Sequence, residues 1–315
     1  MKLSDYVGNT PLIPIEFAGL TVWGKAEFMN PGGSVKDRMA TYIINNAEGK
    51  ELIKKGDTLC EATSGNTGIA FAMLAAERGY KMYIIMPSNM SDERKQMLKF
   101  YGARLIEVDE GDFDGAIALR DEMCEKMGWF NCNQFHNPLN IEPHYHNTGP
   151  ELANQITRGG AVDFDIPDAF IAGTGTGGTI MGCGKYLKSL WSGIKMVAVE
   201  PAESPVMSGG EQGLHGIQGI GDGSKFLVDL DKVDEVITVS TEEAKERSRK
   251  LARENGLFVG VSAGANVLAS ERWIEQNNPD GIVVTILCDR GERYFSILYE
   301  KIWKEIGIQI GENRL

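Results

Sequence analysis

The sequence predicts an α/β fold with two open, twisted and mainly parallel sheets flanked by helices. Short apolar segments alternate with longer amphipathic ones along most of the chain, as in Lys81–Pro87 followed by Ser91–Tyr101. Strands that are apolar along their whole length are typical of parallel sheets covered by helices on both faces. Because 315 residues exceed the usual size of a single core, we expect two sheets with a cleft between them.

The first half of the chain begins with a turn at Gly8–Pro11 and then alternates strands with helices. Gly79 is expected to end one helix, and Asp92 and Glu93 suit the positive N-terminal end of the next. The predicted strands are Leu12–Glu16, Leu20–Phe28, Thr58–Thr63, Lys81–Pro87 and Arg104–Val108, and the predicted helices are Val35–Gly49, Thr67–Gly79, Ser91–Tyr101 and Phe113–Met127. A polar stretch, 131–145, is expected to link the two halves.

The second half repeats the alternation of strands and helices. Ser240-x-x-Glu243 forms a capping box that opens a helix ending at Gly256, and the glycine-rich stretch 205–223 is expected to be loop. The predicted strands are Ala169–Ala172, Met196–Glu200, Glu235–Val239 and Ile282–Cys288, and the other predicted helices are Gly177–Leu190, Ala265–Gln276 and Tyr294–Ile306.

Composition narrows the classes of protein and partner. The net charge of −12 argues against nucleic acid or an anionic membrane as a main partner, and no apolar run approaches the roughly 20 residues of a spanning helix. The first residues lack the regions of a signal peptide, so a cytoplasmic location is expected. Five scattered cysteines without a CxxC pair fit reduced thiols. His144 and His146 lack further ligands nearby, so no metal site is expected.

The segment NPGGSVKDR places Lys36 in the first turn of a predicted helix, with Ser34 as its N-cap. Gly32 and Gly33 permit backbone conformations through which a flat ring can approach the chain closely. The positive end of the helix and burial would both favour a neutral, nucleophilic amine on Lys36. The alternative is an ordinary surface lysine on an amphipathic helix.

Three loops rich in glycine and hydroxyl groups stand at strand-to-helix junctions, where open α/β sheets bind ligands. They are Thr63–Gly68 (TSGNTG), Gly173–Thr179 (GTGTGGT) and Val261–Ala265 (VSAGA). GTGTGGT gives the strongest anion signal, because glycine N–H groups, threonine hydroxyls and a helix N-terminus converge there. It lacks the ending of a Walker loop and the acidic partner of a dinucleotide loop, so a phosphate monoester fits it best, with a structural turn as the alternative. A reactive lysine and a phosphate cup together suggest pyridoxal 5′-phosphate.

The segments GNTPL, NPGGSVKDR, EATSGNTGIA, NQFHNPLN, TGPE, GTGTGGT, GIQGIG, VSAGA and CDRGERY follow one another between Gly8 and Tyr294. In this order they resemble the cysteine synthase / cystathionine β-synthase family of fold-type II pyridoxal-phosphate enzymes. The resemblance implies a fold like that of the tryptophan synthase β subunit, with the cofactor in a cleft between two domains. Residues 36–140, with the N-terminal few residues, would form a smaller mobile domain, and 10–35 plus 141–315 a larger phosphate-binding domain.

The resemblance also implies roles by position. Lys36 would form the Schiff base and carry the substrate α-proton, and Asn66 would bond the 3′-oxygen of the cofactor ring. Ser262 would face the ring nitrogen, and a serine at this place favours β-elimination. The remaining cofactor residues would be Gly173, Gly175, Thr176, Gly177, Gly178, Thr179 and Cys288, and the substrate would be bound by Thr63, Ser64, Asn66, Thr67, Gln134 and Gly219. Read alone, Thr63, Ser64 and Ser262 are also explained by helix capping, and Gln134 by a linker.

Asp222, in GIQGIGDG, stands where the family commonly carries a small or apolar residue. If it projects into the cleft as a catalytic residue, it would deprotonate a weak nucleophile such as water or bind an amine-bearing one. An Asp-Gly turn facing solvent is the alternative. CDRGERY resembles the second cysteine synthase subtype more than the first.

These observations predict β-replacement on a β-substituted L-alanine through an aminoacrylate, interconverting L-cysteine, sulfide and a serine derivative. Asp222 adds a variant of this reaction, in which cysteine and water give serine and sulfide. A β-elimination lyase (cysteine desulfhydrase or serine deaminase) and a non-catalytic nucleotide-binding scaffold are the alternatives. By resemblance, we expect a homodimer, and the C-terminal peptide of a serine acetyltransferase is a further candidate partner.

Overall fold

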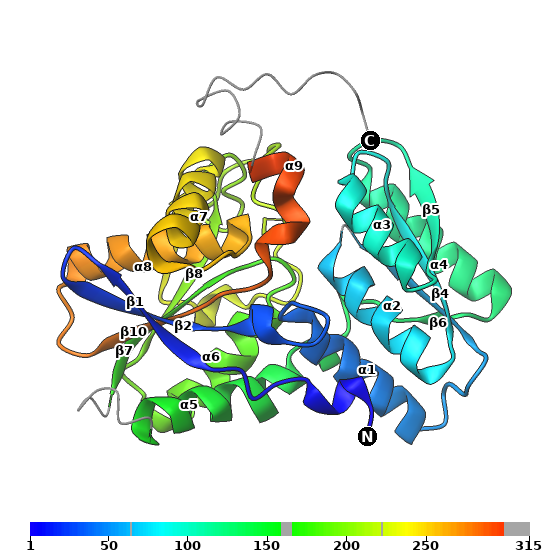
Figure 1. Cartoon of the computed structure of the whole chain (residues 1–315), viewed down its shortest axis with the longest axis horizontal. Coiled ribbons are helices and arrows are strands. Elements are labelled where there is room, and N and C mark those ends of the chain that lie inside the picture. Colours follow the sequence, from blue (N-terminus) through cyan, green and yellow to red (C-terminus); the bar gives the residue numbers. More distant parts are fainter. Residues whose placement is uncertain (64, 159–165, 222, 299–315) are drawn as a thin grey trace.

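The computed structural model describes residues 1–63, 65–158, 166–221 and 223–298, and within them the chain forms a six-stranded and a four-stranded sheet. Figure 1 shows the two sheets side by side, each with helices packed around it. The predicted α/β class with two mainly parallel sheets is therefore confirmed. No helix of the described residues is both long and apolar enough to cross a bilayer.

The larger sheet has the strand order β1-β2-β10-β7-β8-β9. β1 and β2 form an antiparallel hairpin at one edge, and the other neighbours pair in parallel. Its strands are β1 (Leu12–Phe17), β2 (Leu20–Lys25), β7 (Pro167–Gly173), β8 (Lys195–Pro201), β9 (Glu235–Val239) and β10 (Ile282–Ile286). The helices of this large-sheet unit are α5 (Gly149–Arg158), α6 (Gly178–Leu190), α7 (Thr241–Asn255), α8 (Val261–Asn277) and α9 (Phe295–Leu298).

The smaller sheet has the order β5-β4-β3-β6 and is parallel throughout. Its strands are β3 (Thr58–Ala62), β4 (Lys81–Pro87), β5 (Arg104–Val108) and β6 (Phe130–Asn131). The helices of this small-sheet unit are α1 (Lys36–Gly49), α2 (Asn66–Arg78), α3 (Asp92–Phe100) and α4 (Phe113–Met127). Short 3-10 helices cover Leu3–Tyr6, Glu27–Met29, Pro138–Asn140, Leu230–Lys232 and Gly291–Tyr294, and His144–Thr148 is a π-helix.

Each sheet has an apolar core on both of its faces. In the large sheet, Val197 and Val199 face α7 and α8, whereas Phe170 and Ala198 belong to the core beneath α5 and α6. The small sheet is covered by α1 and α2 on one face and by α4 on the other. Strands buried on both faces explain why the sequence shows continuous apolar runs rather than alternation.

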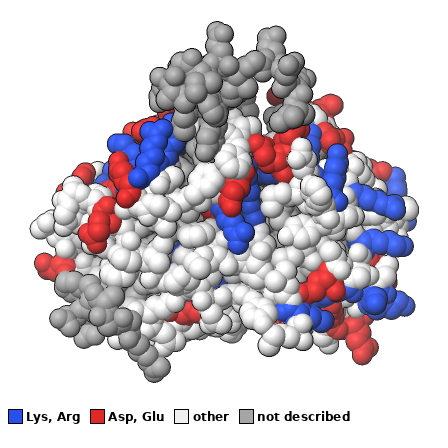
Figure 2. Space-filling model, in the orientation of Figure 1, with Lys and Arg blue, Asp and Glu red and all other residues white. Residues whose placement is uncertain are grey.

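On the face shown in Figure 2, basic and acidic side chains lie interspersed.

Several predicted boundaries are wrong. The strand that begins at Leu20 ends at Lys25 because the chain turns into a 3-10 helix at Glu27, and the strand that begins at Ile282 ends at Ile286. Helix α5 and strand β6 were not predicted. The last predicted helix is seen as α9, and its continuation beyond residue 298 lies outside the described residues.

The predicted loop VSAGA is the first turn of α8. A Cβ on Gly264 would lie 2.2 Å from the carbonyl oxygen of Ala244 in α7. This glycine therefore serves close packing between two helices rather than a turn, because a side chain at this point would push α7 and α8 apart.

Candidate active site

One pocket at the carboxyl ends of the strands brings together residues from both units. It is lined by fourteen of the residues named from the sequence: Lys36, Thr63, Asn66, Thr67, Gln134, Gly173, Gly175, Thr176, Gly177, Gly178, Thr179, Gly219, Ser262 and Cys288. Ser64 and Asp222, the other two, lie outside the described residues. The three glycine-rich loops named from the sequence thus meet here, although the first two are more than 100 residues apart in the chain. Open α/β sheets bring such strand-to-helix loops together at one edge.

Lys36 is the first residue of α1 and is half-buried at the pocket. Gly33 before it has φ +82°, a conformation that favours glycine. The predicted N-cap is displaced by one residue: the helix begins at Lys36 with Val35 at the cap position, and the Ser34 hydroxyl accepts a hydrogen bond from the Lys36 N–H at 3.3 Å. The backbone N–H of Val35 donates to the Cys288 carbonyl oxygen (2.9 Å), which fixes the start of α1 against the large-sheet unit.

The glycine-threonine loop leads directly into α6, whose first N–H groups have no acceptor within the helix. Gly177 has φ +89°, and a Cβ there would lie 2.9 Å from the backbone nitrogen of Val228. A Cβ on Gly178 would lie 2.2 Å from Oδ1 of Asn140. The loop therefore needs glycine for its own close packing, and its bare backbone forms a cradle at a positive helix end. A phosphate monoester fits these groups.

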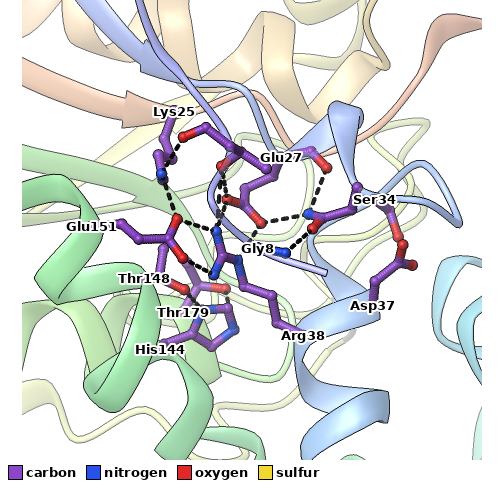
Figure 3. Close-up of polar contacts among 12 residues, drawn as sticks. Gly8, Lys25, Glu27, Ser34, Asp37, Arg38, His144, Thr148, Glu151 and Thr179 are labelled. Carbon is purple, nitrogen blue, oxygen red and sulfur yellow. Dashed lines mark hydrogen bonds and ion pairs between the residues drawn. The ribbon is translucent and has the colours of Figure 1, made fainter. Parts of the chain in front are cut away.

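Two buried side chains hold the threonines of this loop. Asn140 Nδ2 donates to Thr176 Oγ1 at 2.9 Å. His144 lies with Nδ1 3.0 Å from Thr148 Oγ1 and Nε2 3.3 Å from Thr179 Oγ1 (Figure 3). Burial is the main cause that lowers the pKa of His144 from 6.5 to about 3, so the ring is neutral at physiological pH. His146 is exposed beside Glu142, and the described residues contain no cluster of three potential metal ligands.

Acid should destabilise the protein through His144. Because its folded pKa is depressed, the contribution of the neutral ring to stability is complete above pH 6.5 and is lost as the pH falls toward 3. Between pH 7.5 and 5, the free energy of unfolding should fall by about 2 kcal/mol more in the wild type than in His144→Asn. Urea unfolding at several pH values measures this. His146→Asn should keep the wild-type slope, and a wild-type slope in His144→Asn would disprove the assignment.

The side of the pocket that belongs to the small-sheet unit is formed by the start of α2 and by Gln134. Thr67 Oγ1 donates to Gln134 Oε1 (2.6 Å), and Gln134 Nε2 donates to the Ala62 carbonyl oxygen (3.0 Å). The Gln134 amide is therefore held in one orientation, with its second N–H free of these two bonds. Thr63, which is 4 % exposed, accepts from the Gly65 N–H (3.2 Å). Together with the N-terminal end of α2, these groups suit a carboxylate.

Ser262 and Cys288 lie on the large-sheet side of the pocket. Ser262 is buried in the first turn of α8. Burial, with Asp289 next along the chain, raises the pKa of the Cys288 thiol to about 12, and a hydrogen bond with Ser262 opposes the rise. The thiol therefore stays protonated at neutral pH, as a structural cysteine does.

Sequence reasoning missed several residues of the pocket. Asn266 in α8 accepts from the Gly173 N–H (2.7 Å) and donates to the Ile286 carbonyl oxygen (2.8 Å), so it anchors the glycine-threonine loop to β10. An amide within the otherwise apolar run 263–269 is a signal that could have found it. Arg94 of α3 and the aromatic residues Phe113 and Phe135 gave no pattern of their own in the sequence. The pocket residues not named as site residues are Val35, Arg94, Phe113, Phe135, Ala172, Ile220, Asn266 and Ile286.

Four charged side chains form a cluster, three of them buried and Glu151 partly exposed (Figure 3). Arg38 of α1 pairs with Glu27 and Glu151 at 2.7 Å each, and Lys25 of β2 pairs with Glu151 at 2.7 Å. Burial alone would raise the pKa of Glu27, but Arg38 beside it lowers that pKa to about 2. Two cations and two anions thus compensate one another and fasten α1 to β2 and α5. Removing one partner would leave a buried charge uncompensated, which is strongly destabilising.

The family to which this chain belongs follows from comparison with known proteins. A family model described as pyridoxal-phosphate dependent enzyme matches residues 3–289. Cysteine synthase of Staphylococcus aureus is 42 % identical over 303 residues, which cover 94 % of this chain and 95 % of the relative. The chain therefore belongs to the pyridoxal-phosphate-dependent enzymes.

Comparison with solved structures narrows the kind of pyridoxal-phosphate-dependent enzyme that this chain resembles. A hydrogen sulfide-producing enzyme from Fusobacterium nucleatum superposes with a TM-score of 0.87 at 38 % identity, covering 94 % of this chain and 90 % of that one. O-ureido-L-serine synthase gives a TM-score of 0.88 at 36 % identity, covering 99 % and 97 %. Together with the curated relatives, these results make the chain a cysteine synthase-like enzyme of the β-replacement type that depends on pyridoxal phosphate.

Proposed function

We propose that this enzyme replaces the sulfur of L-cysteine with the oxygen of water, giving L-serine and hydrogen sulfide. The bond between the β-carbon and sulfur breaks, a bond between the β-carbon and oxygen forms, and the proton lost by water ends on sulfide. The observation that carries the proposal is the place of Asp222 in the chain. Gly219 and Ile220 line the pocket, and Asp222 follows Ile220 by two residues. Asp222 itself lies outside the described residues.

The proposed roles follow from the contacts around the pocket. Pyridoxal phosphate, when bound, supplies an electron sink that lets the α-proton and the β-substituent leave. Lys36 would hold its aldehyde and then accept the α-proton, and the 175–179 loop would hold its phosphate. Thr67 and Gln134 would bind the substrate carboxylate, because their hydrogen bond fixes the Gln134 amide in one orientation. Ser262 would lie against the ring nitrogen.

Asp222 would act on the entering nucleophile. Water is a poor nucleophile at neutral pH, and a carboxylate near the β-carbon would take its proton as the new bond forms. Sulfide is small and largely ionised, so it needs no such help. A carboxylate at this place thus favours water as the second substrate. The structure of the Fusobacterium hydrogen sulfide-producing enzyme has also been solved as an aspartate-to-asparagine variant with an α-aminoacrylate intermediate.

Asp222→Asn should separate the two directions of the reaction. Sulfide release from L-cysteine, with equimolar L-serine, is expected to fall by about 100-fold, within the usual range for loss of a general base. Formation of L-cysteine from O-acetyl-L-serine and sulfide should change less than about threefold, because sulfide needs no base. Both rates are measured on the holoenzyme, with Asp280→Asn as a surface control. An equal loss in both directions would disprove the role of Asp222.

A second candidate is synthesis of L-cysteine from O-acetyl-L-serine and sulfide, which the curated relatives named cysteine synthase favour. The products distinguish the candidates. L-serine formed from L-cysteine supports water addition, whereas rapid turnover of O-acetyl-L-serine with sulfide and none of L-cysteine alone supports synthesis. Pyruvate and ammonia in place of either amino acid would identify a β-elimination lyase.

We propose three further properties that the family resemblance supports. Residues 36–140, with the N-terminal few residues, form the smaller mobile domain, and 10–35 plus 141–315 the larger one. The enzyme is a homodimer. The C-terminal peptide of a serine acetyltransferase, which ends in a carboxylate, is a ligand that competes with the amino acid for the start of α2. Size-exclusion chromatography with light scattering and peptide titration of the holoenzyme test the last two.

A further inference from the structure

The segment CDRGERY carries charged residues that the proposed reaction does not use. Asp289 is 0 % and Arg293 is 2 % exposed, and both follow β10 in the large-sheet unit. Asn66, the first residue of α2, belongs to the small-sheet unit. Asn66 Nδ2 donates to Asp289 Oδ2 at 2.6 Å, and Arg293 Nη1 donates to Asn66 Oδ1. One carboxamide at the pocket is thus held from both sides by buried charged groups of the other unit.

We infer that Asp289 and Arg293 are positioning residues that orient the Asn66 carboxamide toward the cofactor, an inference that rests on the cofactor contact proposed for Asn66. An arginine side chain can only donate hydrogen bonds, and the Asp289 oxygen that Asn66 contacts acts as the acceptor. The amide oxygen must therefore face Arg293, and one amide N–H must face Asp289. The second N–H of Nδ2 is left over, in a fixed direction, for an acceptor oxygen in the pocket.

Both positioning residues are themselves fixed by further hydrogen bonds. Tyr294, which is fully buried, donates its hydroxyl to the same Oδ2 of Asp289 at 2.5 Å. The backbone of Asp289 pairs with Ser34 and accepts from the Gly260 N–H at 3.1 Å. Arg293 Nη2 donates to the carbonyl oxygen of Gly32, in the loop that precedes Lys36. The arrangement therefore links the orientation of Asn66 to the backbone on which Lys36 is mounted.

Replacement of Asp289 tests the inference because Asn has the same shape as Asp but adds a donor. Asp289→Asn would place an amide N–H or a weaker acceptor opposite Asn66, and the carboxamide would lose its fixed direction. The cofactor should then leave the holoenzyme about 10- to 100-fold faster after dilution, the range expected when a hydrogen bond to a charged group is lost. The visible absorption band of the bound cofactor should also shift.

A double-mutant cycle ties the effect to Asn66. Asn66→Ala alone should accelerate cofactor release, and Asp289→Asn should add less than about twofold in the Asn66→Ala background. If Asn66→Ala leaves release and absorption unchanged, the cofactor contact proposed for Asn66 fails, and the inference fails with it. If Asn66→Ala acts but Asp289→Asn does not, or adds its full effect in the Asn66→Ala background, the inference alone is overturned.

A swapped pair separates positioning from stability. Asn66→Asp combined with Asp289→Asn restores a hydrogen bond between the two units and gives Arg293 a carboxylate partner, but it offers no N–H from residue 66. The melting temperature of this double variant should return to within a few degrees of the wild type, while cofactor release stays fast. Recovery of both would show a purely structural role and overturn the inference. Arg290→Gln is the control, because exposed Arg290 bonds the Phe28 carbonyl oxygen rather than Asn66.

Discussion

Lys36→Ala is expected to abolish the visible absorption of the bound cofactor and to lower turnover by at least about a thousandfold, because we propose the amine as both the covalent anchor and the base for the α-proton. Lys36 lies where both tasks require it, since it begins α1 and lines the pocket, three residues after Gly33 with its φ of +82°. Absorption spectra of the purified protein and assays of sulfide release measure the effect.

The identity of the lysine can be checked chemically. Borohydride reduction of the wild type should attach the cofactor irreversibly to the peptide that contains Lys36, and mass spectrometry of a digest locates the label. Lys50→Ala, at the other end of the same helix, removes an exposed ammonium and should leave the spectrum intact. A label on another lysine, or an unchanged spectrum in Lys36→Ala, would contradict the assignment.

Gly177→Ala is expected to weaken cofactor binding by at least about 100-fold. The residue has φ +89°, where a side chain is strained, and a Cβ would lie 2.5 Å from Cγ2 of Val228 and 2.9 Å from its backbone nitrogen. Relief of these contacts moves the loop and the first N–H groups of α6 away from the phosphate position. Two or three kcal/mol of lost interaction correspond to roughly this factor. Equilibrium dialysis against pyridoxal phosphate measures it.

The matched control uses a glycine outside the loop. Gly193 lies in the turn after α6, and a Cβ there would have no atom within 4 Å. Gly193→Ala should therefore keep wild-type affinity for the cofactor. If Gly177→Ala also kept full affinity while remaining folded by circular dichroism, the loop could not be the phosphate cradle.

Much of the fold could be predicted because the strands are buried on both faces. Four predicted elements coincide with observed ones, which are β4 (Lys81–Pro87), β5 (Arg104–Val108), α4 (Phe113–Met127) and β9 (Glu235–Val239). Each is bounded by residues with a local signal, such as Gly128, which has φ +65° after α4. The start of α8 could not be predicted, since glycine and serine in VSAGA are typical of loops and their helical state depends on packing against α7.

The pocket was predictable where chemistry leaves a local pattern. Glycines and threonines before a helix indicate an anion, so the glycine-threonine loop could be named as a candidate site, and it does line the pocket. Arg94 could not, because it reaches the pocket only through the packing of the folded chain. Asp289 and Arg293 were visible in a recognisable segment, but their partner is Asn66, 223 residues away from Asp289. Only the folded chain shows that partner.

The buried ion pairs of Arg38 determine how the attachment of α1 responds to salt. Mobile ions screen the attraction between exposed charges over a Debye length, which is about 8 Å at physiological ionic strength and about 3 Å at 1 M, but buried pairs are screened much less because the ions act through solvent. Arg38 is 2 % and Glu27 0 % exposed in their side chains, whereas the surface pair Lys126–Glu122 is 68 % and 55 % exposed. Concentrated salt will therefore weaken the surface pairs first. The buried ion pairs that attach α1 to its neighbours beside the pocket will persist at higher salt.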